Sequence, residues 1–282
     1  MRGEGLLFES EDGRSRFLVR IGTPPVVIGR RPPYEPQNIR VNSVLVSRQH
    51  VRIVNGPGGY AVEDAGSTGG AYLDGERLRG LTPIGAGVRI QLGGDAVFVP
   101  RTFAGATLAE LWQDGGSPAD LPGVLRMTRD ALRALKPLHG AGDVHGNLDP
   151  HHVLYDEAAD SWTLQIDGWT VLDPDGVVSG DPIYVAPEVL DRQELVAGSD
   201  LYALGLVAFE TLFGYRPFDD RDPHTNLMAK QFGGAPAWRG RPPSDAIQDF
   251  FLRLLMLYPH ERYDIGRITE RIYELRPELR SR

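Results

Sequence analysis

The chain has 282 residues, 41% hydrophobic and 24% charged, which is typical of a folded protein with room for two ordinary domains. Its net charge of −8 argues against a nucleic-acid partner, and the absence of cysteine excludes disulfides, thiolate metal sites and thiol nucleophiles. Residues 1–15 show no secretory signal, and the apolar stretch 201–213 is too short to span a bilayer. We therefore expect a cytoplasmic protein that does not contact a membrane.

The first hundred residues predict a β-rich domain. Short segments rich in apolar and β-branched residues alternate with turns that contain Gly, Pro or Asn-Gly. The expected strands are 17–21, 26–28, 50–54, 60–63, 71–73, 88–92 and 96–99. Many short strands at close spacing are typical of a β-sandwich.

The rest of the chain predicts helices, because its apolar residues recur at helical spacing. One helix is expected after the cap-like residues 117–120, with an apolar face over 124–138 and a kink caused by Pro137. Two further helices are expected at about 201–212 and 244–255. The fold class is therefore multidomain, with an all-β sandwich followed by a mainly α-helical domain.

Three segments of the first domain carry groups suited to phosphate. Gly-Arg ends the strand at 28–30, Ser-Arg-Gln-His lies within 46–50, and a glycine-rich turn occupies 66–70. In this order and spacing the segments resemble the forkhead-associated (FHA) domain, a family that binds phosphothreonine peptides. A guanidinium fork and a hydroxyl donor suit the phosphothreonine group, which carries nearly two negative charges.

The resemblance assigns roles to residues of these segments. It implies that Arg30 and Ser47 contact the phosphate, and that His50 is structural. The expected phosphopeptide-binding residues are Arg30, Ser47, Arg48, Ser67, Thr68 and Gly69.

Position 69 departs from the family pattern. The family has an asparagine there that bonds the peptide backbone, whereas this chain has Gly69 and, at a later asparagine position, Asp74. Losing such a buried contact costs ~1–3 kcal/mol, so the grip on the peptide is expected to be weaker. A phosphate-independent interaction module therefore remains an alternative.

Residues 144–154 read Val-His-Gly-Asn-Leu-Asp-Pro-His-His-Val-Leu and resemble the protein-kinase catalytic loop H-R-D-L-K-P-x-N-x-L. Further kinase-like segments follow the kinase order. They are 105–111 after the hinge, 166–169 at D-F-G, 180–188 at the A-P-E segment, 199–205 in the central helix and 259–263 at the late arginine. Together these segments cover the C-terminal lobe of a kinase nearly end to end.

The catalytic positions of that loop carry other residues. By the resemblance, Asn147 stands at the position of the catalytic Asp, Asp149 at that of the Lys and His152 at that of the magnesium-binding Asn. Asp167 keeps the Asp of D-F-G, with a backbone role as the favoured interpretation. The histidines within 145–152 could form a metal site, but we expect no bound metal there. We also expect no cofactor and no catalytic residue. The sequence thus predicts a pseudokinase that is not an enzyme.

The structural positions of the kinase pattern are kept. The resemblance implies a buried ion pair between Glu188 and Arg262, and it implies that Asp200 binds backbone donors of the catalytic loop. These residues are expected to hold the architecture of the lobe.

The expected domains are an FHA domain at 1–101 and a pseudokinase C-lobe at 102–282, which opens with a hinge-like segment at 102–116. No N-lobe is expected, because neither Lys136 nor Lys230 lies where the nucleotide-binding lysine belongs.

These interpretations predict a phosphothreonine-binding adaptor in bacterial Ser/Thr kinase signalling, with the kinase-like lobe as a scaffold for protein interaction. The expected partner is a phosphothreonine-containing protein, either a Ser/Thr kinase or its substrate, and a homodimer is left open. Besides the phosphate-independent module, a nucleotide-binding kinase completed by an N-lobe in trans is an alternative.

Overall fold

The computed structural model describes residues 3–114, 120–172, 181–192, 194–219, 221–232, 236, 238–239 and 243–281. It divides into two compact units. The first comprises Met1–Ala106, Tyr155–Asp160 and Gln165–Trp169, and the second Thr107–Leu154, Ser161–Leu164 and Thr170–Arg282. The first unit is built of sheets and the second mainly of helices, as the sequence predicted. The expected boundary between residues 101 and 102 falls inside strand β11.

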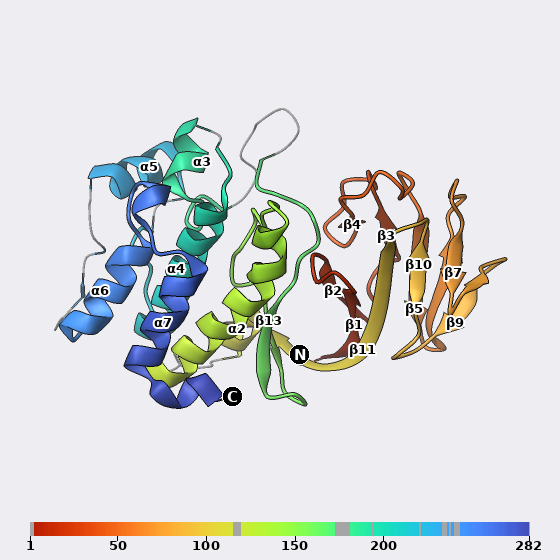
Figure 1. The fold of residues 1–282 in the computed structure, drawn as a ribbon, viewed down its shortest axis with the longest axis horizontal. Helices are drawn as coiled ribbons and strands as arrows, with labels where there is room; N and C mark the ends of the chain where they lie inside the picture. The colour runs from red at the N-terminus through yellow and green to blue at the C-terminus, as the bar shows by residue number, and fades with distance from the viewer. Residues whose placement is uncertain are drawn as a thin grey trace. The chain divides into compact units, whose positions relative to one another are not determined.

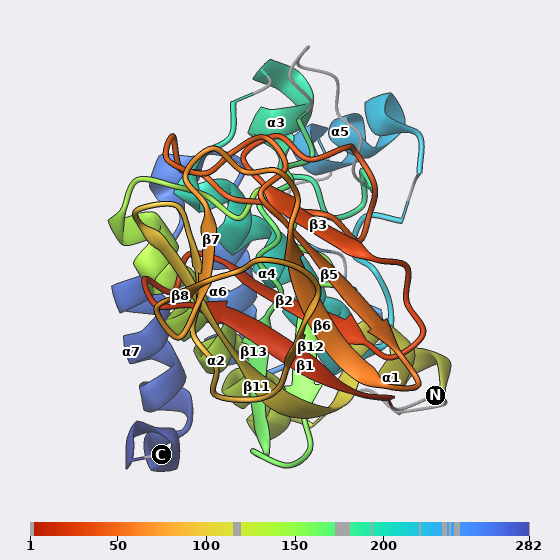
Figure 2. The same ribbon diagram turned by 90° about the vertical axis from the view of Figure 1, so that its right-hand side faces the viewer.

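The first unit contains two sheets. Their strands are β1 (Gly3–Ser10), β2 (Arg16–Arg20), β3 (Val26–Gly29), β4 (Ile39–Arg40), β5 (Val51–Gly56), β6 (Gly59–Asp64), β7 (Ala71–Leu73), β8 (Glu76–Arg77), β9 (Thr82–Ile84), β10 (Ile90–Leu92) and β11 (Ala96–Thr107). One sheet has the order β4-β3-β5-β6-β9; in the other, β11-β10-β7-β8 follow one another, and β1 joins β11 to β2. Figure 2 shows β3, β5 and β6 side by side.

The core of this unit lies between the sheets, because alternate residues of each strand point inward. Phe8 of β1 stacks on Phe17 of β2 with ring centroids 5.0 Å apart, and Phe17 meets Phe98 of β11 edge-on at 5.6 Å. Ile28 and Ile53 of the opposite sheet belong to the same apolar cluster. The first unit is therefore a β-sandwich.

The second unit is mainly helical. It contains α1 (Leu108–Gln113), α2 (Leu121–Gly140), α3 (Pro187–Arg192), α4 (Ala197–Phe213), α5 (Pro223–Phe232), α6 (Asp245–Leu254) and α7 (Ile265–Leu275), with the short helices η1 (Pro259–Glu261) and η2 (Pro277–Ser281). Strand β13 (Ser161–Leu164) belongs to this unit, and β12 (Val153–Asp156) is shared between the units. Helix α2 packs against both α4 and α7 (Figure 1).

Local sequence explains where the long helices begin and end. The side chain of Asp120 accepts a hydrogen bond from the Gly123 amide at 2.9 Å and so caps α2, whereas residues 117–119 lie outside the described residues. Helix α2 continues through Pro137 to its end at Gly140. Helix α4 ends at Gly214, whose φ of 71° lies in the left-handed region that favours glycine. Of the helices described, none is long and apolar enough to cross a membrane.

Candidate functional site

The loop after β3 and the loop before β5 are joined through their backbones. The Arg30 amide donates to the Ser47 carbonyl at 2.9 Å, and the Arg31 amide donates to the Arg48 carbonyl at 3.1 Å. A Cβ at Gly29 would lie 2.1 Å from the Arg48 carbonyl oxygen, so only glycine permits this approach. These contacts place two predicted phosphate-binding residues, Arg30 and Ser47, side by side.

The Ser47 hydroxyl lies between two loops. Its oxygen accepts the Thr68 amide at 3.0 Å, which leaves the hydroxyl proton for a further acceptor. The Ser47 amide donates to His50 Nδ1 at 2.9 Å, so the proton of this imidazole sits on Nε2, which donates to the Gly70 carbonyl at 3.0 Å. Because His50 is fully buried, it holds the two loops together and does not meet a ligand.

The side chain of Ser67 is bound to a neighbouring carboxylate. Its hydroxyl and its amide both donate to Asp64, at 2.9 and 2.6 Å, and the Ala71 amide adds a third bond at 3.1 Å. Burial raises the pKa of Asp64, but these hydrogen bonds outweigh it and bring the pKa below 3.8. The glycine-rich turn therefore presents Thr68 and not Ser67, although both stood among the predicted binding residues.

Gly69 packs closely against a neighbouring loop. A Cβ at this position would lie 3.2 Å from the Cα of Gly93, whose own φ of 61° is left-handed. An asparagine at position 69 would need this loop to move by a few tenths of an ångström. The glycine at position 69, where the family has asparagine, thus fits the close approach of Gly93.

Arg77 of β8 is a candidate that the sequence analysis missed. A Cβ at Gly70 would lie 3.2 Å from Arg77 Nε and 3.4 Å from one of its terminal nitrogens, which places this guanidinium beside the turn at 66–70. Its signal in the sequence was a hairpin that returns an arginine to the turn. Within the described part of the chain, neither Arg30 nor Arg48 has a carboxylate within ion-pair distance, so this end of the sandwich suits an anion.

The second candidate site is the kinase-like loop, which is held by Asp200 of α4. Its carboxylate accepts the His145 amide at 2.8 Å and the Gly146 amide at 2.7 Å, and it meets His139 Nε2 at 2.8 Å. Asp200 is almost fully buried. Three donors in a buried site balance the desolvation of the carboxylate.

A carboxylate and an imidazole meet within this loop. Asp149 accepts from His152 Nδ1 at 2.8 Å and from the His151 amide at 2.8 Å. Burial raises the pKa of the Asp149 carboxyl, but the hydrogen bond from His152 and the charge of His152 outweigh this effect. The net pKa of Asp149 therefore lies below its ordinary value of 3.8. His152 Nε2 lies 3.5 Å from Asn147 Nδ2. The structure thus brings together three of the residues that stand at catalytic positions of the kinase pattern.

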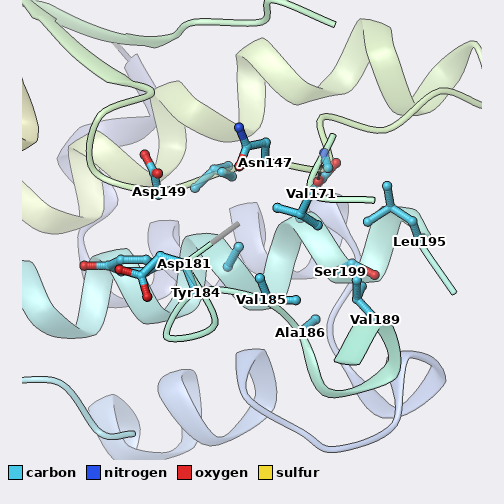
Figure 3. A pocket seen from close by; sticks show the side chains of 14 residues that line it. Asn147, Asp149, Val171, Asp181, Tyr184, Val185, Ala186, Val189, Leu195 and Ser199 are labelled. Carbon is cyan, nitrogen blue, oxygen red and sulfur yellow. Dashed lines mark hydrogen bonds between the residues drawn. The ribbon is translucent and has the colours of Figure 1, made fainter. Parts of the chain in front are cut away.

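These side chains border a small hollow. Figure 3 shows Asn147 and Asp149 on one side and Asp181 and Tyr184 on the other. Its cavity volume of about 20 Å³ accommodates a water molecule. Magnesium prefers oxygen ligands, whereas the Asp149 carboxylate is already hydrogen-bonded to His152, which itself offers nitrogen. No group of three or more His, Asp or Glu suited to a metal occurs among the residues described.

Asp167 belongs to the first compact unit, whereas the loop at 144–154 belongs to the second up to Leu154. Its carboxylate accepts the Trp169 amide at 3.0 Å, and its carbonyl accepts the Arg40 amide at 2.8 Å. Sequence reasoning grouped Asp167 with the catalytic loop because of the order of kinase motifs; the contacts group it with the sandwich.

The A-P-E segment is held by a buried ion pair. Glu188 and Arg262 form a bidentate ion pair at 2.7 and 2.8 Å, and the Ser199 hydroxyl donates to the same carboxylate at 2.7 Å. Both charged side chains are buried. This pair holds α3 against α4 and the loop that follows α6.

Lys230 of α5 is a buried amine whose role the sequence analysis did not identify. Its Nζ donates to the carbonyls of Pro182, Ile183 and Val185 at 2.7, 3.2 and 2.7 Å. Burial nevertheless lowers the pKa of Lys230 to about 7. Lys230 therefore fixes the backbone of residues 182–185, part of which lines the same hollow as Asn147.

Comparisons with known proteins bear on both units. Residues 26–93 match the FHA domain, and residues 96–273 match the protein kinase domain. Calcium/calmodulin-dependent protein kinase type 1 of Caenorhabditis elegans is 33% identical over 147 residues, which cover 49% of this chain and 41% of that protein. Human serine/threonine-protein kinase H2 is 32% identical over 159 residues, covering 52% and 40%, and human serine/threonine-protein kinase H1 is 34% identical over 154 residues, covering 51% and 35%. The chain thus spans only about two fifths of the length of these relatives.

The expectation that the protein is not an enzyme is therefore wrong. A protein kinase domain match over residues 96–273, with relatives named as kinases, points to a protein kinase enzyme. The expectation rested on the residue types at 147, 149 and 152. Residue types at three positions are weaker evidence than a match over a whole domain, and within this loop the Asp149 carboxylate still contacts the His152 imidazole.

Proposed function

Because the chain carries an FHA domain and belongs to the protein kinase family, we propose that it is a phosphothreonine-dependent adaptor in bacterial Ser/Thr kinase signalling. The sandwich reads a phosphothreonine on a partner, which is a Ser/Thr kinase or its substrate. Reading the mark brings the kinase domain of the same chain to that partner.

The observation that carries this proposal is the junction of Arg30, Ser47 and Thr68. The backbone bonds of Arg30 and the hydroxyl of Ser47 tie the three loops together before any ligand arrives. Arg30 Nε donates to the Val46 carbonyl at 3.2 Å, which orients the guanidinium and leaves its terminal nitrogens for an anion. Donors that are held in place in advance bind phosphate with little loss of conformational entropy.

The second unit is proposed to correspond to the C-terminal lobe of a kinase. Strand β11 ends at Thr107 and α1 begins at Leu108, so no residues remain between them for a nucleotide-binding lobe. The alternative to the adaptor is a nucleotide-binding kinase that is completed by an N-lobe supplied in trans. Its substrates would be proteins held by the FHA domain.

Calorimetry with phosphothreonine peptides of randomised flanks tests the proposal. The Arg30→Ala variant should bind at least about tenfold more weakly, since charge-assisted hydrogen bonds contribute about 1.5–3 kcal/mol each. Arg79→Ala is the matched control, because Arg79 is an exposed arginine of the same unit. An Arg30→Ala variant with wild-type affinity would contradict the proposal.

A second candidate function follows from Gly69, which lacks the amide that would bond a peptide backbone. Binding of the same peptides with equal affinity before and after dephosphorylation would favour a phosphate-independent interaction module instead.

A further inference from the structure

A segment at a catalytic position of the kinase pattern is bound by the sandwich. Residues 166–169 occupy the place of D-F-G in the sequence, yet they lie in the segment Gln165–Trp169, whose contacts assign it to the first compact unit. The Arg16 amide donates to the Ile166 carbonyl at 2.9 Å, and the Ile166 amide donates back to Arg16 at 2.5 Å. Ile166 thus extends the edge of the sandwich at the start of β2, as a bound peptide strand does.

The other end of the segment is held by side chain and backbone together. Trp169 Nε1 donates to the Asn38 carbonyl at 2.7 Å, and its ring meets Tyr34 edge-on with centroids 5.0 Å apart. The Arg40 amide donates to the Asp167 carbonyl at 2.8 Å. Every partner of these bonds lies between β3 and the end of β4.

Gly168 fits this surface because it has no side chain. Its φ is 77°, and a Cβ would lie 2.0 Å from the Arg40 carbonyl oxygen. Real Cβ atoms do not approach backbone oxygen so closely, and backbone cannot swing aside as a side chain does. A single methyl group at position 168 would therefore force the segment off the sandwich.

The same stretch of backbone leads to the phosphate loops. Strand β4 pairs in parallel with β3, with Arg40 opposite Gly29, and the Val41 amide donates to the Gly29 carbonyl at 2.9 Å. The next residue of the chain is Arg30. The backbone of Arg40 thus contacts Asp167, and it also pairs with strand β3, which leads directly to Arg30.

From these contacts we infer that the FHA domain positions the Asp167 segment of the kinase domain, and that phosphothreonine binding at Arg30 and Ser47 is coupled to this positioning. The inference rests on the proposed phosphate site. Strand β4 has only two residues and pairs with a single strand, so its order depends on its neighbours. An anion that immobilises Arg30 orders the end of β3, hence β4, and hence the surface that Ile166 to Trp169 occupy. Coupling is reciprocal, so releasing the segment weakens phosphothreonine binding by the same factor.

Hydrogen exchange on the full chain provides the test, with O-phospho-L-threonine as the probe and L-threonine as its control. Bound probe should slow exchange at the amides of Ile166 and Arg40. It should also slow exchange at the Thr68 amide, which reports on the phosphate site itself.

Gly168→Ala should speed exchange at Ile166 and weaken binding of the probe by about fivefold or more, the lower end of typical coupling. Gly22→Ala is the matched control, because Gly22 has a φ of 84° but nothing within 4 Å of its Cβ position. Should Gly168→Ala fail to fold, Tyr34→Ala removes the ring contact at a side chain that is 73% exposed.

The outcomes separate the two proposals. If the variants release the segment while affinity for the probe and protection of Thr68 stay at wild-type values, the coupling is refuted and the phosphate site stands. If the wild-type chain shows neither protection at Thr68 nor binding of the probe, the proposed function fails and the coupling fails with it.

Discussion

Replacing Arg262 by alanine should destabilise the second unit severely. Its guanidinium makes two bonds to Glu188, at 2.7 and 2.8 Å, and it donates to the carbonyls of Met256, Gly198 and Leu257 at 2.8, 2.9 and 2.9 Å. None of the Arg262 side chain is exposed, and only 6% of the Glu188 side chain is. The substitution leaves a buried carboxylate without its counter-charge and three carbonyls without a donor.

The cost of removing one partner of a buried pair is about 3–5 kcal/mol. A domain is typically stable by only about 5–15 kcal/mol, so this loss is a large share. With a slope of about 2 kcal/mol per molar urea, the unfolding midpoint should fall by about 2 M.

Urea unfolding followed by circular dichroism at 222 nm measures this change, because helices α1 to α7 all lie in the second unit. Arg271→Ala is the control. Arg271 pairs with Glu274 and Asp249 at the surface, where such pairs contribute about 0–1 kcal/mol. If Arg262→Ala shifts the midpoint no more than Arg271→Ala does, the buried pair does not support the lobe as argued here.

Three further substitutions test other contacts. Burial lowers the pKa of Lys230 from 10.5 to about 7. Between pH 7 and 10.5 the unfolded chain therefore keeps the Lys230 ammonium proton, whereas the folded chain releases it. The free energy of unfolding should rise with pH in this range, by at most about 1.4 kcal/mol per pH unit. Lys230→Met should abolish this rise in urea unfolding at pH 7 to 9, and an unchanged slope would count against the reasoning. Ser47→Ala should weaken phosphothreonine binding about tenfold in calorimetry, whereas Ser67→Ala, whose hydroxyl already bonds a carboxylate, should change it little; equal losses would contradict this distinction. Gly105→Ala should lower the free energy of unfolding by at least about 1–3 kcal/mol, because the new Cβ would lie 1.9 Å from the Tyr155 carbonyl oxygen. Gly80→Ala is its control and should leave the melting temperature unchanged, because nothing lies within 4 Å of its Cβ position. Equal melting temperatures for the two variants would refute the clash.

Periodicity predicted the elements whose core face is continuous in the chain. The apolar face expected over 124–138 is buried in α2, and the strand expected at 26–28 is observed as β3. Strand β1 was missed, and it shows no alternation of buried and exposed residues, because Leu6, Leu7 and Phe8 are all buried. It pairs with β11, nearly a hundred residues away, and a pairing so distant leaves little local signal.

Helix α7 was also missed. Its apolar residues Ile265, Ile268 and Ile272 follow helical spacing, so this signal was available in the sequence. Only Ile268 and Ile272 are buried, which matches a helix that covers the unit with one face.

The candidate phosphate site was predictable in part. Motif order indicated Arg30, Ser47 and Thr68, and their loops do meet. Motif order could not indicate that the Ser67 hydroxyl bonds Asp64, because a hydroxyl in a glycine-rich turn can point in several directions.

The sequence by itself determined the two kinds of structure, the loops that carry arginine and serine, and the kinase-like order of the second half. These features depend on residue type, spacing and local turns. Only the tertiary structure decided which unit holds Asp167, since that depends on the bonds of Arg16, Arg40 and Trp169 across long stretches of chain. It likewise decided that Asp149 and His152 meet, because a loop can direct neighbouring side chains in several ways and only the donors and acceptors around them select one.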